Sequence, residues 1–286
     1  MVMGANNNNM KKKLLVSFSG GETSAFMAQW LWKHKQDEYE MLFVYANTGQ
    51  ENEETLKFIN ECENEFGFKI NWIECDVKDG KGNGTSFIVT DFKNAKRNGE
   101  PFEQVIKKYG IPNPAFLHCT RELKMNPIKA FAKSVWGKEK YYLAIGIRVD
   151  EFDRMNDKFK ELRIIYPLIS EIPMTKPKIN FWWKQQNFRL QLKGYQGNCV
   201  TCYKKSDKKL FQIAKENPST FDFFNRMEEQ YGEGKYQFFR QNRTTKQILE
   251  QAKEWNGNVI DDSQNITIQT DLFSENCEPF TNDCSV

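Results

Sequence analysis

Histidine is scarce in this chain: His34 and His118 are its 2 histidines among 286 residues. A His-rich metal site and an easily recognised Ser-His-Asp arrangement both need more histidine than this, so neither is expected. Charge of one sign is not in excess either, because a net charge of +3 neither requires nor excludes a nucleic-acid partner. The composition therefore directs attention away from hydrolases of the triad type.

Long apolar runs are also absent from the sequence. No uninterrupted apolar segment reaches membrane-spanning length, and the polar, Asn-rich stretch 1–13 has no apolar signal core. We therefore expect a cytoplasmic protein with no membrane partner. With 39% hydrophobic residues the chain can bury a sizeable core. We expect a flexible leader over 1–12, an α/β domain over 13–170 and a helix-rich, cysteine-containing region over 171–286.

Apolar runs of strand length alternate with helix-patterned segments in the first part of the chain. The expected strands are 14–18, 41–46 and 69–75, and the helices between them are 25–32 and 53–66. This order with short connections predicts an α/β fold, a parallel sheet with flanking helices and right-handed crossovers. The Lys- and Gly-rich segment 76–100 is expected to be irregular. Further expected elements are a strand at 141–147, an extended segment at 164–168 and helices at 102–109, 127–136, 178–186, 204–216, 218–231 and 244–255.

Two polar turns follow two of the expected strands. Ser19-Gly20-Gly21 lies between the first strand and a helix, where free backbone N–H groups and the helix dipole suit a phosphate. An ordinary βα turn with small residues is the alternative. Asn47-Thr48-Gly49 ends the second strand. Because ligands of parallel sheets bind outside the carboxyl ends of the strands, the two turns predict one polar cleft.

The seven cysteines fit thiols or metal ligands better than disulfides, since no export signal is present. Cys199 and Cys202 have the two-residue spacing that lets two thiolates face one metal. With Cys119, and with Cys284 or Cys277, they would supply four ligands for Zn²⁺ or a [4Fe–4S] cluster. A redox pair favoured by Lys204 and Lys205, and plain buried thiols, are the alternatives.

Aromatic and basic residues interleave in 178–184 and 235–240. Such a pattern suits base stacking, and it equally suits helices with one buried and one solvated face.

Several separated motifs resemble one family. Ser19-Gly20-Gly21-Glu22-Thr23-Ser24 resembles the pyrophosphate-loop (PP-loop) motif S-G-G-x-[D/T]-S of the adenine nucleotide α-hydrolase-like superfamily, in particular its PAPS reductase branch. The further matches, in chain order, are Asn47-Thr48-Gly49 with Glu53-Glu54-Thr55-Leu56, Cys119 with Lys124 and Pro127, Gly146-Ile147-Arg148 with Asp150-Glu151, and Tyr166-Pro167-Leu168.

The resemblance implies a nucleotide-binding sheet and assigns roles to residues. The residues expected to bind ATP or a PAPS-like nucleotide are Ser17, Ser19, Gly20, Gly21, Thr23, Ser24, Asn47, Thr48, Gly49 and Gly146. Arg148, Lys124 and Arg121 are the candidate catalytic cations, and surface charge is the alternative for the last two. Thr23 stands where many relatives have Asp, and the E-C-G-[I/L]-H segment of assimilatory PAPS reductases does not occur.

The leading hypothesis is an enzyme that cleaves ATP at the α-phosphate with Mg²⁺, adenylates an acceptor and then transfers sulfur. One alternative is a thiol-dependent reductase of a phosphoadenylyl sulfate. Another is a non-catalytic module that binds nucleotides or nucleic acid. The acceptor, a small molecule or a nucleic acid, and the oligomeric state, a homodimer among the alternatives, stay open.

Overall fold

A six-stranded sheet in the order β4-β3-β2-β1-β5-β6 forms the centre of the computed structural model. The structure describes residues 10–78, 80, 83–114, 116–197, 199–232, 238–240 and 242–266. All neighbouring strands run parallel except β3 and β4. The predicted α/β fold is therefore confirmed. The strands are β1 (Lys12–Ser17), β2 (Tyr39–Asn47), β3 (Ile70–Val77), β4 (Thr85–Thr90), β5 (Tyr142–Ala144) and β6 (Ile164–Ile165).

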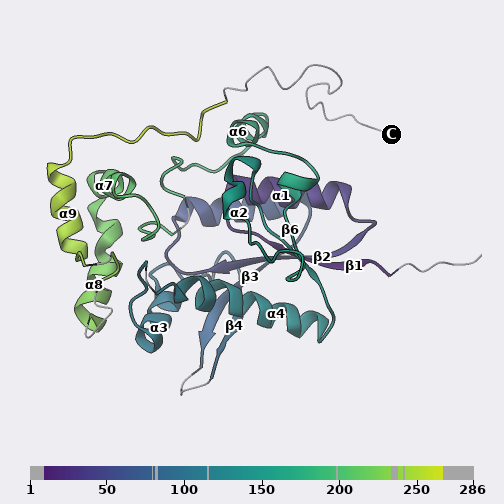
Figure 1. Ribbon diagram of the computed structural model, residues 1–286, viewed down its shortest axis with the longest axis horizontal. Coiled ribbons are helices and arrows are strands. Elements are labelled where there is room, and N and C mark those ends of the chain that lie inside the picture. The colour runs from purple at the N-terminus through teal and green to yellow at the C-terminus, as the bar shows by residue number, and fades with distance from the viewer. Residues whose placement is uncertain are drawn as a thin grey trace, which may run out of the picture.

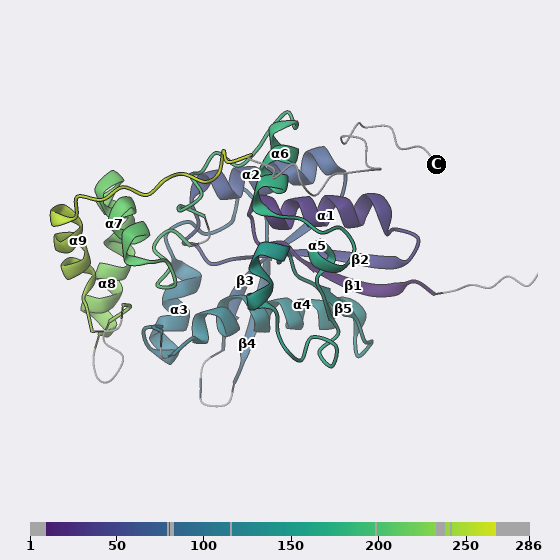
Figure 2. The same ribbon diagram turned by 45° about the horizontal axis from the view of Figure 1, so that its top comes forward.

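Helices cover both faces of the sheet, as Figures 1 and 2 show from two directions. One face carries α1 (Glu22–His34), α2 (Glu53–Phe66) and α6 (Lys176–Lys184), whose apolar sides share a core with β1 and β2. The other face carries α4 (Asn126–Trp136), which packs on the same strands from below. A strand covered on both faces must be apolar throughout, which explains the continuous run that forms β2.

The order of the strands reverses at β1, which pairs with β2 on one side and with β5 on the other. In open parallel sheets a crevice forms at such a switch point, outside the carboxyl ends of the strands. The segments after β1 and β5 therefore meet there. The turn after β2 lies at the same edge, because β2 runs parallel to β1.

The last helices lie beyond the carboxyl edge of the sheet, on the side away from the start of β1 (Figure 1). They are α7 (Asp207–Glu216), α8 (Asp222–Tyr231) and α9 (Thr245–Glu254), with a 3₁₀ turn (Pro218–Phe221) before α8. Ser206 caps α7, and Thr244 forms a capping box with Gln247 at the start of α9. Helix α3 (Glu100–Tyr109) joins this group to the sheet, since Phe102 packs on Phe223 and Phe224 of α8.

Three sequence predictions need correction. The segment 76–100 contains β4, which pairs antiparallel with β3, because its Phe87-Ile88-Val89 core has strong β propensity despite the Gly-rich sequence before it. The strand expected at 141–147 is only Tyr142–Ala144. The extended segment at 164–168 is the two-residue β6, and Pro167 then begins the short helix α5 (Pro167–Ser170).

Helix α6 belongs to the main core, although it lies after the boundary expected at residue 170. Trp183 is fully buried there and packs edge-on against Phe58 of α2. For 178–184 the ordinary helix-face interpretation is thus confirmed, whereas residues 235–237 of the second aromatic segment lie outside the described residues. Among the residues that the structure describes, no helix is both long enough and apolar enough to cross a bilayer.

Candidate functional site

The loop between β1 and α1 is built around Gly20. This residue has φ +82°, and a Cβ atom there would lie 2.7 Å from Thr55 Cγ2 and 3.1 Å from Ile59 Cδ1. Both the left-handed backbone and the close packing of α2 behind the loop thus require glycine. Gly21 differs, because its φ of −103° suits any residue and a Cβ there would meet only Ser19 Oγ, at an ordinary contact distance of 4.0 Å.

Ser19 and Ser24 close the loop on itself. The Ser24 hydroxyl accepts from the Ser19 backbone N–H at 3.1 Å and from the Ser19 hydroxyl at 2.9 Å, and it donates to the Gly21 carbonyl oxygen at 2.9 Å. Within the described residues no side chain caps the start of α1. The first N–H groups of α1, with the positive end of its dipole, are therefore available to an anion.

The back of the loop is fixed by residues from far along the chain. Glu22, at the first position of α1, is buried and makes a two-point ion pair with Arg189 at 2.9 and 3.1 Å. The Trp183 indole N–H donates to the Glu22 carbonyl oxygen at 2.9 Å. Burial raises the pKa of Glu22, although Arg189 opposes the rise. These contacts fix the position of the first turn of α1.

Arg148 reaches the loop from the far side of the switch point. Its Nη1 donates to the Thr23 hydroxyl at 2.9 Å, and the same guanidinium pairs with Asp150 at 3.0 Å and Glu151 at 3.2 Å. Gly146 allows this approach, because a Cβ there would lie 3.3 Å from Ser24 Cα. The structure thus brings Arg148, Gly146, Thr23 and Ser24 together at one edge.

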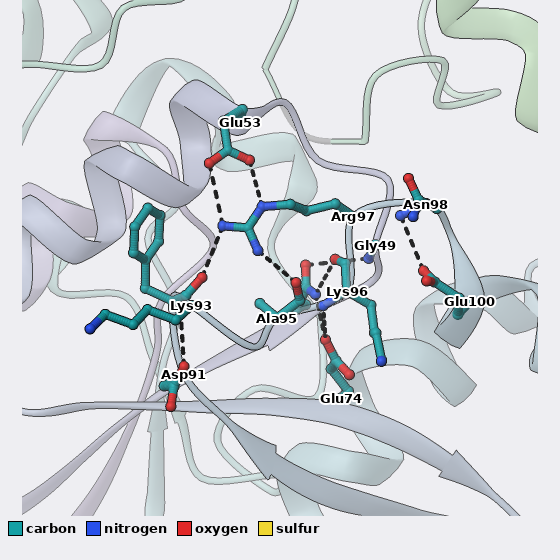
Figure 3. Close-up of polar contacts among 12 residues, drawn as sticks. Gly49, Glu53, Glu74, Asp91, Lys93, Ala95, Lys96, Arg97, Asn98 and Glu100 are labelled. Carbon is teal, nitrogen blue, oxygen red and sulfur yellow. Dashed lines mark hydrogen bonds and ion pairs between the residues drawn. The ribbon is translucent and has the colours of Figure 1, made fainter.

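The turn after β2, Asn47-Thr48-Gly49, is held in place by residues 95–97, which lie between β4 and α3. The buried Asn47 amide donates to Glu74 Oε1 at 2.7 Å and to the Lys96 carbonyl oxygen at 2.8 Å. Arg97 of the same segment donates to the Glu53 carboxylate and to the Ala95 carbonyl oxygen, each at 2.7 Å, and Figure 3 shows its guanidinium between these two groups. Asn47 thus holds the turn in place, and its amide N–H groups are already used by protein acceptors.

Gly49 and Thr48 complete this turn. Gly49 has φ +75°, and a Cβ there would lie 3.0 Å from Gly99 Cα. The Thr48 hydroxyl lies 2.9 Å from both carboxylate oxygens of Glu51 and 3.5 Å from Cys199 Sγ. The turn after β2 therefore touches the cysteine-containing segment directly.

A cavity of about 650 Å³ lies between this turn and the C-terminal helices. Its wall includes Thr48, Cys119, Lys124, Cys199, Cys202 and Lys205. The knuckle around Cys199 is docked by backbone pairing, since Val200 N–H donates to the Gln50 carbonyl oxygen at 2.9 Å. The residues of the Ser17–Ser24 loop are not part of this wall. The cavity and the loop are therefore neighbours at one sheet edge with Thr48 as the boundary.

Lys124 lines the cavity from a π-helical turn, Thr120–Met125, that runs directly into α4, and Cys119 lines it from the position just before that turn. Such turns often mark functional sites. The Cys119 thiol lies 3.8 Å from the Tyr203 hydroxyl, and Lys124 Nζ lies 3.9 Å from Glu51 Oε1. Arg121 is not brought to the cavity. Its Nε donates to Glu122 Oε1 at 2.6 Å, and its side chain lines a separate pocket.

Burial keeps Cys199 in its thiol form. Its pKa is raised to about 12, by burial first and by the neighbouring Glu51 carboxylate second. Burial also lowers the pKa of Lys205 to about 8, while its Nζ donates to the Tyr195 carbonyl oxygen at 2.9 Å.

Comparison with known proteins gives one family match and two relatives. Residues 13–109 match the phosphoadenosine phosphosulfate reductase domain, which belongs to the adenine nucleotide α-hydrolase-like superfamily. A nin region protein of Escherichia phage lambda, described as uncharacterised, is 32% identical over 215 residues, which are 74% of this chain and 72% of that protein. The chain belongs to the PAPS reductase family.

A second relative is an uncharacterised protein of Methanocaldococcus jannaschii. It is 27% identical over 150 residues, 52% of this chain, and the match spans 26% of that longer protein. The PAPS reductase match contains the loop Ser17–Ser24 and the turn Asn47–Gly49, and it ends before Cys119. The family assignment thus covers the first two parts of the site and leaves the cavity to be argued from its own residues.

The predicted metal ligands are brought together only in part. Cys119, Cys199 and Cys202 line one cavity, but no three His, Cys, Asp or Glu side chains in the described part of this PAPS reductase family member are arranged to hold a metal. Cys277 and Cys284 lie outside the described residues.

Sequence reasoning missed two residues of the site. Glu51 and Arg189 form the ion pairs and hydrogen bonds that organise the two loops, with Arg189 lying 167 positions from its partner Glu22. Glu51 carried a weak signal, since it lies two residues after Gly49 of the Asn47-Thr48-Gly49 turn. Arg189 carried none, because its partner is so distant in sequence.

Proposed function

We propose that this PAPS reductase family member binds ATP or a related adenylyl nucleotide at the Ser17–Ser24 loop and cleaves it at the α-phosphate. The observation that carries the proposal is the uncapped start of α1 behind Gly20 and Gly21, facing Arg148 across the switch point. Oriented N–H groups and a guanidinium stabilise the charge that develops on departing pyrophosphate. A nucleophilic atom of the acceptor attacks the α-phosphorus and becomes adenylated as pyrophosphate leaves. In the later sulfur-transfer step, a sulfur nucleophile supplied by a separate donor displaces AMP from the adenylated acceptor.

The side chains beside this loop do not form a Mg²⁺ site of their own. Thr23, Asp150 and Glu151 direct their oxygens at Arg148, and the described residues contain no group of three His, Cys, Asp or Glu side chains that could hold a metal. Mg²⁺ would therefore be held mainly by the phosphates of the nucleotide. When bound, Mg²⁺ supplies charge neutralisation for the phosphates. For Zn²⁺ or a [4Fe–4S] cluster, the described cysteines do not form a ligand group, so no step of the proposed reaction passes through one.

The test is ATP binding and pyrophosphate release by the wild type and by Gly21→Ala. Alanine suits the φ and ψ of −103° and 157°, and its methyl group has 4.0 Å to the nearest side-chain atom, so folding is preserved. The methyl group intrudes on the phosphate site and is expected to raise the Kd for ATP at least about tenfold, or about 1.4 kcal/mol. Gly84→Ala, on an exposed hairpin turn, is the matched control. Absence of ATP binding by the wild type at millimolar concentration refutes the proposal.

The cysteines that line the cavity favour a second candidate, a thiol-dependent reductase of an adenylyl sulfate. A nucleophilic thiol should be ionised near neutral pH, and the raised pKa of about 12 at Cys199 opposes this role for that residue. Adenylation is therefore placed first. Sulfite release with a thioredoxin-type dithiol, abolished by Cys199→Ser or Cys202→Ser, would reverse this order.

A further inference from the structure

Five cations line the cavity beside the loop. Lys204, Lys205 and Lys209 come from the knuckle and the start of α7, while Lys124 and Arg154 come from the sheet side. Three of them lie close together in sequence, within residues 204–209, and the fold brings Lys124 and Arg154 to the same cavity. Asp and Glu side chains are absent from the described part of the cavity wall.

The charges on the two sides of the cavity are balanced differently. Lys124 has Glu51 at 3.9 Å, and Arg154 has Glu151 as its ion-pair partner. Within the described residues, Lys204, Lys205 and Lys209 have no carboxylate within 4 Å. Lys205 instead donates to the carbonyl oxygens of Tyr195 and Gly197. The wall formed by the knuckle and α7 thus carries positive charge without an acidic partner.

We propose that this cavity binds a small co-substrate that carries a phosphate, sulfate or carboxylate group. A volume of about 650 Å³ lies within the range of small-molecule sites, roughly 300–1,000 Å³. Lysine ammonium groups form charge-assisted hydrogen bonds with such oxyanions. The inference extends the proposed function by giving the acceptor an anionic group, whereas the binding itself is independent of nucleotide.

The position of the cavity supports the role of an acceptor site. Thr48, at its boundary, follows β2 at the same sheet edge as the Ser17–Ser24 loop. A co-substrate held there lies beside a nucleotide bound at the loop without sharing its phosphate contacts. Cys199, 3.5 Å from the Thr48 hydroxyl, places a thiol on the same wall.

The test uses inorganic phosphate and sulfate as probes in calorimetric titrations of the full chain at low ionic strength. The double variant Lys204→Glu/Lys209→Glu is expected to weaken probe binding at least about tenfold, because it removes two cations that would donate charge-assisted hydrogen bonds to the probe. Both side chains belong to exposed residues, so the fold is kept. The control, Lys208→Glu, changes the charge of an exposed neighbour that is not part of the cavity wall, and a change of less than about twofold is expected.

Three outcomes of the probe titrations overturn the inference. They are the absence of wild-type probe binding, an equal loss in Lys208→Glu, and stoichiometric displacement of phosphate by ATP, which would assign the cavity to the nucleotide. Tight, salt-sensitive binding of a single-stranded oligonucleotide that Lys208→Glu weakens equally would identify a general basic surface instead. Because the probes are titrated without nucleotide, failure of ATP to bind leaves this test intact.

Discussion

The Arg148 guanidinium donates to the Thr23 hydroxyl over 2.9 Å, which joins the segment after β5 to the first turn of α1 across 125 positions of sequence. Thr23 stands at the position where the pyrophosphate-loop motif that this segment resembles allows either Asp or Thr. Here the carboxylates come from Asp150 and Glu151, which pair with the same guanidinium. Asp150 and Glu151, in the segment after β5, thus place negative charge beside the Ser17–Ser24 loop.

Thr23→Val tests this link. Valine keeps the volume and removes the hydroxyl, so Arg148 loses one acceptor while Asp150 and Glu151 remain. The loss of one hydrogen bond, about 0.5–1.5 kcal/mol, predicts a rise of about two- to tenfold in the Kd for ATP by calorimetry. Thr90→Val, on the edge strand β4, should leave the Kd unchanged. Equal Kd values for both variants would show that the Thr23 hydroxyl does not organise the site.

Gly20→Ala measures the packing behind the loop. The methyl group would meet Thr55 Cγ2 at 2.7 Å in a left-handed backbone, so we expect a loss of about 2–4 kcal/mol in the free energy of unfolding by urea. Gly67→Ala is the matched control, because Gly67 also has a positive φ, +70°, but has open space around it. It should lose only about 1–2 kcal/mol. Equal losses would mean that α2 yields to the methyl group.

Glu22→Gln tests the buried ion pair through pH. Because burial raises the pKa of Glu22 in the folded state, protonation of this group stabilises the fold below about pH 4.5, and that contribution is lost as pH rises through the raised pKa. Relative to the wild type, Glu22→Gln should therefore gain stability as pH increases above about 4.5. Urea unfolding at several pH values measures this, with Glu65→Gln as the charge control on the exposed side of α2. A difference independent of pH would contradict the raised pKa.

Asp207→Asn tests how α7 is held. Hydrogen bonds from Arg243 and Arg240 lower the pKa of Asp207, so its contribution to stability is present above about pH 3.8 and is lost as pH falls through the lowered pKa. The pair is partly exposed, and we expect a loss of only about 1 kcal/mol at neutral pH. The difference in stability between the wild type and Asp207→Asn should disappear at acidic pH, once Asp207 is protonated. Asp157→Asn, at an exposed residue, should show no gap in the same thermal or urea melts.

The parallel sheet and the two polar turns could be predicted because they depend on local patterns. Apolar runs gave β1, β2 and β3, and helical spacing ending at Gly67 gave α2 with its observed bounds. Strand β4 has a local signal in the β propensity of Phe87-Ile88-Val89, but the prediction missed it because the surrounding segment is rich in Lys and Gly. Its pairing with β3 is a long-range contact that sequence periodicity does not contain.

The site shows the same division. The consecutive glycines Gly20 and Gly21 predict a phosphate loop because they leave backbone N–H groups accessible. The two-residue spacing of Cys199 and Cys202 predicts a cysteine knuckle. The partners Arg189 and Glu51 are ordinary charged residues until the fold places them against Glu22 and Cys199. The separation of Arg121 from Lys124 follows from the π-helical turn, whose altered spacing directs these neighbours to different hollows.

The contacts behind the loop also set an order of assembly on the ribosome. Glu22 emerges early, but its ion-pair partner Arg189 is made 167 positions later, and the Ser263 carbonyl oxygen that accepts from Arg189 later still. A nascent chain that ends near residue 170 thus carries the loop without its rear support. If the loop binds nucleotide as proposed, its affinity should therefore appear late in synthesis, once α6 and the segment that contains Ser263 have docked behind α1.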